Sequence, residues 1–109
     1  MSAITTHVLD AVLGKPAAGI SVRLDRWDET DWTTIATGAA GADGRCRDLA
    51  VNAEFGIYRL TFASGAYLAR DGRESIYPEI SITFNCDGEA SYHLPLLLSD
   101  NSYTTYRGS

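Results

Sequence analysis

The chain has two histidines, His7 and His93, and their surroundings are the first place to look for chemistry. A histidine is the side chain whose ordinary pKa lies closest to neutral pH, so it is suited to general base catalysis there. Apolar residues alternate along Tyr92-His93-Leu94-Pro95-Leu96-Leu97-Leu98, which predicts a strand. If Leu94 and Leu96 face the core, His93 lies on the outer face of that strand with Pro95 and Leu97.

Residues around His7 alternate in the same way. The predicted core face consists of Ile4, Thr6, Val8, Asp10 and Val12, and His7 shares the outer face with Thr5, Leu9 and Ala11. Outer faces that carry Leu9 and Leu97 are poorly suited to water, so we expect another subunit to cover them. A histidine between subunits is partly desolvated, and this can tune it as a base. The alternative, which the pattern alone favours, is a pair of surface or interface histidines without chemistry.

The last four residues, Tyr106-Arg107-Gly108-Ser109, are unusual for a terminal segment, which is commonly frayed. They combine an aromatic ring, a guanidinium, a flexible glycine and a hydroxyl. One interpretation is a tail that closes over a small polar ligand, with Arg107 paired to an anion and Tyr106 stacking or donating a hydrogen bond. The other is a last strand with a solvated tip, and composition does not separate the two.

Short strands must position these residues. Runs rich in β-branched and aromatic residues alternate in polarity at Ile20-Ser21-Val22-Arg23-Leu24-Asp25, Tyr58-Arg59-Leu60-Thr61-Phe62 and Ile80-Ser81-Ile82-Thr83-Phe84-Asn85. Turn signals recur between such runs, which is typical of an all-β sandwich or barrel. We expect a hairpin from Asn85 into Tyr92 with Asp87-Gly88 as its turn, and one short helix over residues 64–72. Pro95, inside a strand, indicates a strand edge or a bulge.

Composition excludes several functions. The 109 residues predict a single domain over 1–109. Nine Lys and Arg against 14 Asp and Glu give a net charge of −5, which argues against nucleic-acid binding. The sequence has neither an apolar run of membrane-spanning length nor a secretion signal, so we expect no membrane partner and a cytoplasmic location. Cys46 and Cys86 are expected to be reduced, and no metal-site spacing is present.

Several motifs together resemble the transthyretin-related family. They occur in order along nearly the whole chain: His7-Val8-Leu9-Asp10, Leu13-Gly14-Lys15-Pro16-Ala17, Ala42-Asp43-Gly44-Arg45, Tyr58-Arg59-Leu60-Thr61-Phe62, Ser75-Ile76-Tyr77-Pro78-Glu79, His93-Leu94-Pro95-Leu96-Leu97-Leu98-Ser99 and Tyr106-Arg107-Gly108-Ser109. The terminal tetrapeptide resembles the ending of the 5-hydroxyisourate hydrolase branch of that family, which the hormone-carrying branch lacks. The resemblance implies a transthyretin-like β-sandwich of two antiparallel sheets with one short helix. It also implies a homotetramer, a dimer of dimers, with active sites at the dimer–dimer interface.

The implied activity is hydrolysis of 5-hydroxyisourate to 2-oxo-4-hydroxy-4-carboxy-5-ureidoimidazoline in urate degradation, without a cofactor or metal. The resemblance assigns catalysis to His7, Arg45 and His93, and substrate binding to Tyr106, Arg107, Gly108 and Ser109. We expect His7 to be the base, Arg45 to stabilise negative charge on the substrate, and His93 to position water or share the proton. The alternative is a non-catalytic carrier of a planar ligand in the inter-subunit channel.

The chain departs from the family at three positions. Asp100 and Asn101 stand where the family often has proline and an aromatic residue, which leaves the shape of that loop open. Cys46, directly after Arg45, stands where an apolar residue is common, and no role is assigned to it.

Overall fold

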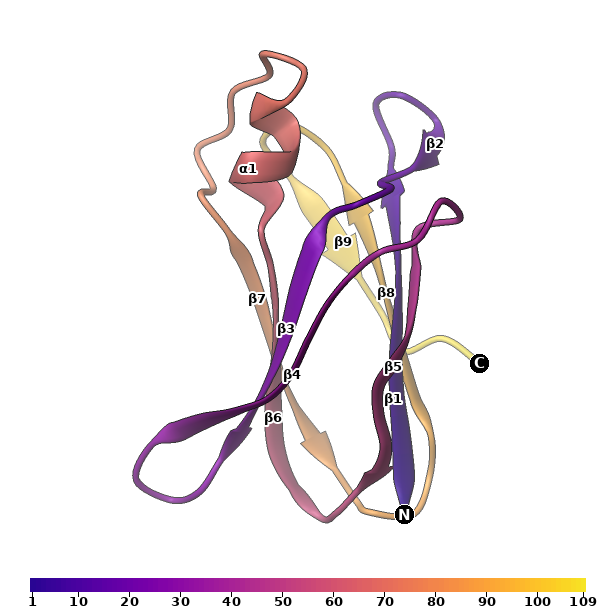
Figure 1. The fold of residues 1–109 in the computed structure, drawn as a ribbon, viewed down its shortest axis with the longest axis vertical. Helices are drawn as coiled ribbons and strands as arrows, with labels where there is room; N and C mark the ends of the chain where they lie inside the picture. The colour runs from indigo at the N-terminus through magenta and orange to yellow at the C-terminus, as the bar shows by residue number, and fades with distance from the viewer.

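Two β-sheets pack face to face in the structure, a computed structural model that describes residues 1–109 with the side chain of residue 48 excepted. The strands are β1 (Ser2–Asp10), β2 (Lys15–Pro16), β3 (Ser21–Trp27), β4 (Trp32–Ala39), β5 (Arg45–Ala53), β6 (Gly56–Phe62), β7 (Ile80–Cys86), β8 (Tyr92–Leu98) and β9 (Tyr103–Thr105). The first sheet has the order β2-β1-β8-β9, and β5 pairs with β1. The second has the order β4-β3-β6-β7. Figure 1 shows the two layers side by side.

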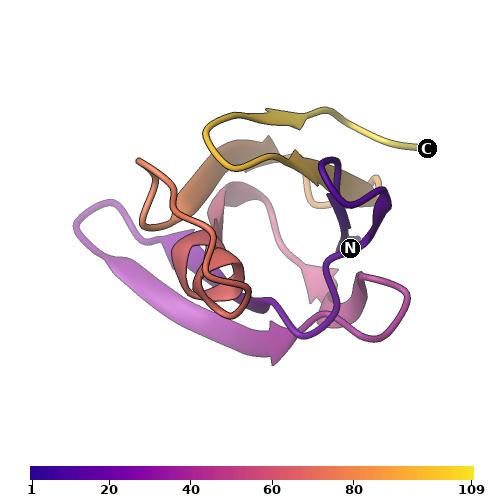
Figure 2. The same ribbon diagram turned by 90° about the horizontal axis from the view of Figure 1, so that it is seen from above.

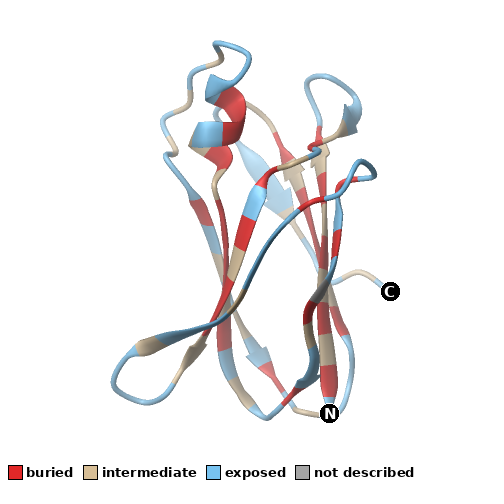
Figure 3. Ribbon diagram, viewed as in Figure 1, coloured by how far each residue is buried: buried red, intermediate tan, exposed pale blue. Residues whose placement is uncertain are grey.

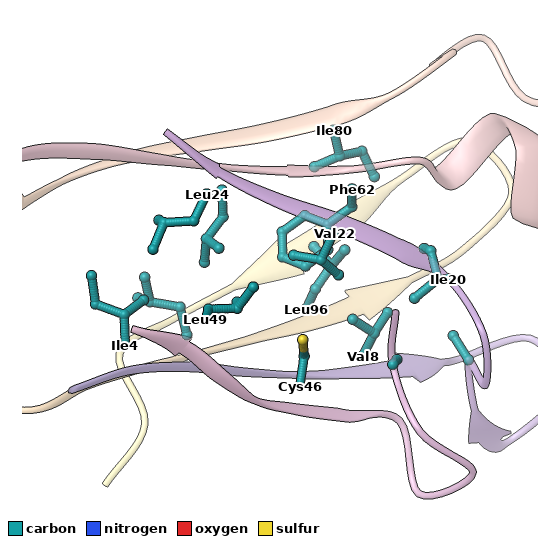
Figure 4. Packing of buried hydrophobic residues seen from close by; sticks show 14 of the residues in the cluster. Ile4, Val8, Ile20, Val22, Leu24, Cys46, Leu49, Phe62, Ile80 and Leu96 are labelled. Carbon is teal, nitrogen blue, oxygen red and sulfur yellow. The ribbon is translucent and has the colours of Figure 1, made fainter. Parts of the chain in front are cut away.

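The core lies between the sheets, and buried residues alternate with less buried ones most regularly along β1 (Figure 3). The predicted inward faces of β1 and β8 are buried, including Ile4, Val8 and Leu96, and they meet Phe62 from the opposite sheet (Figure 4). Val12 is an exception to the predicted core face, since it is 57% exposed. The reason is that β1 ends at Asp10, so the alternation does not extend to Val12.

The predicted sandwich with one short helix is confirmed, and one strand pair in it is parallel. β1 and β8 run parallel from Ile4↔Tyr92 to Asp10↔Leu98, while the other strand pairs are antiparallel. The predicted hairpin around Asp87-Gly88 is wrong, because β7 belongs to one sheet and β8 to the other. The turn signal is real, since Gly88 has a φ of 79°. It closes a crossing between sheets, where Tyr92 hydroxyl accepts a hydrogen bond from Asp87 N–H.

Pro95 occupies a break in the ladder between β8 and the C-terminal residues. The β8–β9 pairing ends at Leu96↔Thr105, and an isolated bridge follows at His93↔Gly108. Pro95 lies between these two contacts, at a position that is not paired with the C-terminal residues. The N–H that proline lacks is therefore not needed for pairing there. The predicted edge or bulge is therefore a local interruption beside the C-terminal tail.

The helix α1 spans Ser64–Ala69, shorter than the predicted 64–72. Six residues are too few for a helix that is stable by itself, so packing must hold it. Tyr67 and Leu68 supply that packing and are buried. Figures 1 and 2 show α1 at the end of the sandwich that also carries the turn between β8 and β9. No helix in the described part of the chain is long and apolar enough to cross a membrane.

Candidate active site

The parallel pairing of β1 and β8 brings the two histidine-bearing strands together. Thr5 lies opposite His93, and His7 lies two residues further along, opposite Pro95. Both histidines are on the outer face of the sheet, as alternation predicts, and both are partly buried. The Thr5 hydroxyl is 2.8 Å from Nδ1 of His93. This hydrogen bond fixes the ring and leaves Nε2 as the nitrogen available for chemistry.

His93 is held in its neutral form. Burial lowers its pKa below the usual histidine value, and the positive charge of Arg45 and the nearby His7 lower it further. A neutral imidazole at pH 7 has a lone pair with which to accept a proton. His93 can therefore act as a base, or as a neutral hydrogen-bonding group, beside the positively charged guanidinium of Arg45.

His7 is oriented by the turn that precedes β5. Its Nε2 lies 2.8 Å from the backbone carbonyl oxygen of Asp43. Because a carbonyl oxygen only accepts hydrogen bonds, Nε2 donates and carries the proton. The turn depends on Gly44, which has a φ of 80° and packs tightly against the backbone of Val8 and the ring of His7. A Cβ at residue 44 would collide with the Val8 carbonyl oxygen and would lie 3.2 Å from Cδ2 of His7, so the turn requires glycine at this position.

Asp43 also organises Arg45. Its Oδ1 accepts a hydrogen bond of 3.0 Å from the backbone N–H of Arg45, and its Oδ2 lies 3.8 Å from Nε of that guanidinium. Arg47 pairs with the same carboxylate at 3.0 Å. The backbone hydrogen bond to Arg45 and the ion pair with Arg47 lower the pKa of Asp43, so it stays ionised. Arg45 is thus placed beside His7, its partner in the β1–β5 register.

The C-terminal residues close one side of the site. The Gly108 N–H donates a 2.7 Å hydrogen bond to the carbonyl oxygen of His93. A cavity of about 310 Å³ lies there, and its lining residues are Thr5, Arg45, Ser91, His93, Gly108 and Ser109. It is a polar pocket that presents a neutral imidazole, a guanidinium and hydroxyls to one small volume. His7 is not among the lining residues and lies beside the pocket, as the register partner of Arg45.

Tyr106 and Arg107, predicted to bind substrate, do not line this cavity. Tyr106 is 54% exposed. Arg107 turns back along β8, where its guanidinium lies 4.2 Å from the ring centre of Tyr92 and donates a hydrogen bond to the Ser91 carbonyl oxygen. The structure therefore brings together Arg45, His93, Gly108 and Ser109 of the predicted residues, places His7 beside them, and directs the other two elsewhere.

Thr5 and Ser91 are pocket residues to which the sequence analysis gave no role. The signal for Thr5 was available, because it shares the outer face of β1 with His7 two residues away. Ser91 precedes β8 and offers no comparable signal. A larger hollow of about 480 Å³ elsewhere is lined by Arg23, Thr61 and Glu79 among others, and it contains no histidine. Among the described residues, no group of three or more His, Cys, Asp or Glu is arranged to hold a metal ion.

The fold and the site together define a class: a two-sheet sandwich of the transthyretin type that carries a polar pocket on an outer sheet face. A family model, the HIUase/Transthyretin family, matches residues 4–108. The chain belongs to this family. The 5-hydroxyisourate hydrolase of Mesorhizobium japonicum is 46% identical over 97% of this chain and 91% of that relative.

Solved structures agree with this assignment. The 5-hydroxyisourate hydrolase of Klebsiella pneumoniae matches with a TM-score of 0.90 and 40% identity over 100% of both chains. A sea bream transthyretin solved in complex with thyroxine matches with a TM-score of 0.91 and 32% identity, over 96% of this chain and 93% of that one. Both branches of the family share the fold to the same degree, so the fold alone does not separate a hydrolase from a carrier.

Proposed function

We propose that this chain is a cyclic-amide hydrolase that converts 5-hydroxyisourate to 2-oxo-4-hydroxy-4-carboxy-5-ureidoimidazoline in urate degradation. The observation that carries the proposal is the pocket in which neutral His93, Arg45 and the C-terminal Ser109 converge. The names and the identity of the hydrolase relatives support the same substrate. Residues 1–109 act as a single domain in this account.

Hydrolysis of a cyclic amide needs a base for water and a positive charge for the carbonyl oxygen. His93 takes a proton from water through Nε2, while its Nδ1–H donates to the Thr5 hydroxyl. The water oxygen bonds to the carbonyl carbon, and the negative charge that develops on the carbonyl oxygen is stabilised by Arg45. Collapse of this intermediate breaks the ring C–N bond, and the proton held by His93 passes to the released nitrogen.

This assignment moves the base from His7, the sequence-based prediction, to His93. The reason is that His93 lines the pocket, whereas Nε2 of His7 donates to the Asp43 carbonyl. His7 stays a predicted catalytic residue, and its ring lies beside Arg45 in the β1–β5 register and against the turn that precedes β5. Gly108 and Ser109 bind substrate at the wall of the pocket, and the predicted binding role of Tyr106 and Arg107 stays a prediction.

A homotetramer, arranged as a dimer of dimers with active sites between dimers, is part of the proposal. Leu9 and Leu97 lie on the same outer face as the histidines and stay partly exposed in the single chain. A second subunit would cover these leucines and exclude water from the pocket. Electrostatic interactions between the pocket residues and a substrate are stronger where water is excluded. Light scattering after size exclusion checks the assembly. No nucleic-acid or membrane partner is proposed, and a cytoplasmic location stays a prediction.

The test is catalytic turnover. Freshly generated 5-hydroxyisourate in large excess over protein should disappear much faster than it does in buffer, with many substrate molecules converted per chain. The alternative is a carrier of planar ligands, which the likeness to the thyroxine-bound transthyretin supports. A carrier would bind its ligand stoichiometrically and would not accelerate the decay of excess 5-hydroxyisourate. That result would refute the hydrolase proposal in favour of a carrier.

A further inference from the structure

A buried ionic cluster holds the end of the sandwich that carries α1. Its centre is Asp10, the last residue of β1, whose side chain is 0% exposed. The Asp10 carboxylate accepts hydrogen bonds from the backbone N–H groups of Val12 and Leu13 and from the hydroxyl of Tyr67. Arg73 binds both of its oxygens, with Nη1 2.6 Å from Oδ2 and Nη2 3.2 Å from Oδ1. A buried carboxylate is tolerated here because each oxygen is paired.

Arg73 extends this cluster to the turn between β8 and β9. Its Nη2 and Nε also donate to Oδ1 of Asp100, at 2.6 and 2.9 Å. The guanidinium side chain is only 13% exposed and joins the two carboxylates. A second link lies beside it, because Oδ1 of Asn101 accepts a hydrogen bond from the backbone N–H of Ile76.

The turn held in this way is the start of the C-terminal segment. β9 follows directly and pairs with β8 over three residue pairs only, from Leu98↔Tyr103 to Leu96↔Thr105. Beyond β9, the tail returns to β8 through the Gly108–His93 bridge. Such a short strand at a sheet edge has little stability of its own. The position of Gly108 and Ser109 at the pocket therefore depends on how firmly the chain is held at each end of β9.

We propose that Arg73 and Asp100 are positioning residues that hold the C-terminal tail at the active-site pocket. Asp10 fixes Arg73, Arg73 fixes Asp100, and Asp100 fixes the origin of β9. The kinetic part of the inference rests on the proposed hydrolase function, while the structural part does not.

The test variant is Asp100→Ala, because removing Arg73 instead would leave the buried Asp10 unpaired and risk misfolding. Glu74→Ala is the matched control, since Glu74 is an exposed carboxylate adjacent to Arg73 in sequence. The first readout is hydrogen exchange of the tail amides, above all the Gly108 N–H. We expect exchange at least about tenfold faster in Asp100→Ala, which removes both charge-assisted hydrogen bonds from Arg73 to Asp100, and unchanged exchange in Glu74→Ala. Asp100→Asn keeps an acceptor oxygen and should restore part of the protection.

The second readout is steady-state kinetics. Asp100→Ala should raise KM for 5-hydroxyisourate several-fold and change kcat little, because the tail supplies binding and not the base. Tail exchange equal to that of the unmodified protein would overturn the proposal, even if thermal stability fell. Faster tail exchange with an unchanged KM would also overturn it, since the tail would then not serve the pocket. If the unmodified protein hydrolyses no substrate, the proposed function fails and the exchange experiment still decides whether the ion pair holds the tail.

Discussion

Thr5→Val removes the hydroxyl bonded to His93 and changes little else in the site. Valine is β-branched like threonine and favours strands, so β1 should keep its conformation and its register with β8. The Thr5 hydroxyl lies 2.8 Å from Nδ1 of His93, the nitrogen that carries the proton when Nε2 acts as the base. In Thr5→Val, the Nδ1–H of His93 loses the hydroxyl that accepts its hydrogen bond. The imidazole ring is then free to rotate away from its productive orientation.

The size of the effect follows from that one hydrogen bond. A neutral hydrogen bond contributes about 0.5–1.5 kcal/mol net, and a buried donor left without a partner costs about 1–3 kcal/mol. His93 is only partly buried, so water compensates some of this loss. A loss of about 1–2 kcal/mol in transition-state stabilisation corresponds to a rate lowered about 5- to 30-fold. The loss should fall mainly on kcat, because the bond orients the base.

The assay compares kcat and KM of the unmodified protein, Thr5→Val, Thr5→Ser and Thr83→Val at pH 7. Thr5→Ser keeps the hydroxyl and should recover most of the rate. Thr83 is an exposed threonine of β7 in the other sheet, so the same substitution there should leave kcat unchanged. A kcat for Thr5→Val within twofold of the unmodified protein, with the fold intact, would refute the role assigned to this hydrogen bond.

Three further predictions concern pH and packing. Because burial, Arg45 and His7 lower the pKa of His93, kcat/KM should fall to half of its plateau value only at a pH below 6.5; a pH–rate profile with its midpoint at or above 6.5 would contradict this. Gly108→Ala would place a Cβ 2.8 Å from Cδ2 of His93, so activity should drop and the Gly108 amide should lose protection from hydrogen exchange; full activity would show that the tail tolerates displacement. Burial would raise the pKa of Asp10, but hydrogen bonds from Arg73, Leu13 and Tyr67 lower it to about 2. The pKa of Asp10 is therefore lower in the folded than in the unfolded protein. Ionised Asp10 contributes about 2 kcal/mol to the free energy of unfolding above about pH 4, and this contribution is lost as pH falls toward 2. Urea unfolding of Asp10→Asn at a series of pH values should lack this acid-dependent loss.

The sheets and the faces of their strands were predictable because they follow from alternation. The period of two that placed Leu94 and Leu96 inside placed His93 outside, and the same rule applied to His7. Alternation carries no information about which strands pair. The turn at Asp87-Gly88 looked like a hairpin because the signal is local, whereas the parallel pairing of β8 with β1 is decided by long-range packing.

The site was only partly predictable for the same reason. Residue types and spacing pointed to the two histidines and left a ligand-binding C-terminal tail as one of two interpretations, whereas the role of Arg45 was assigned through the family resemblance. Nothing in the local pattern indicates that Gly108 would bridge to His93 or that Arg73 would join Asp10 to Asp100. These contacts link residues far apart in the chain, and they arise only when both sheets and the turns between them are in place.

In the proposed mechanism, Arg45 and His93 form one hydrolytic centre. The most direct measurement is the rate of 5-hydroxyisourate consumption, with substrate generated in place from urate, for the unmodified protein, Arg45→Ala, His93→Asn and the control Arg47→Ala. We expect Arg45→Ala and His93→Asn each to lose about 10²-fold or more in kcat, while Arg47→Ala stays close to the unmodified protein. Rates for Arg45→Ala and His93→Asn equal to that of the unmodified protein, in variants with intact fold and assembly, would contradict this mechanism.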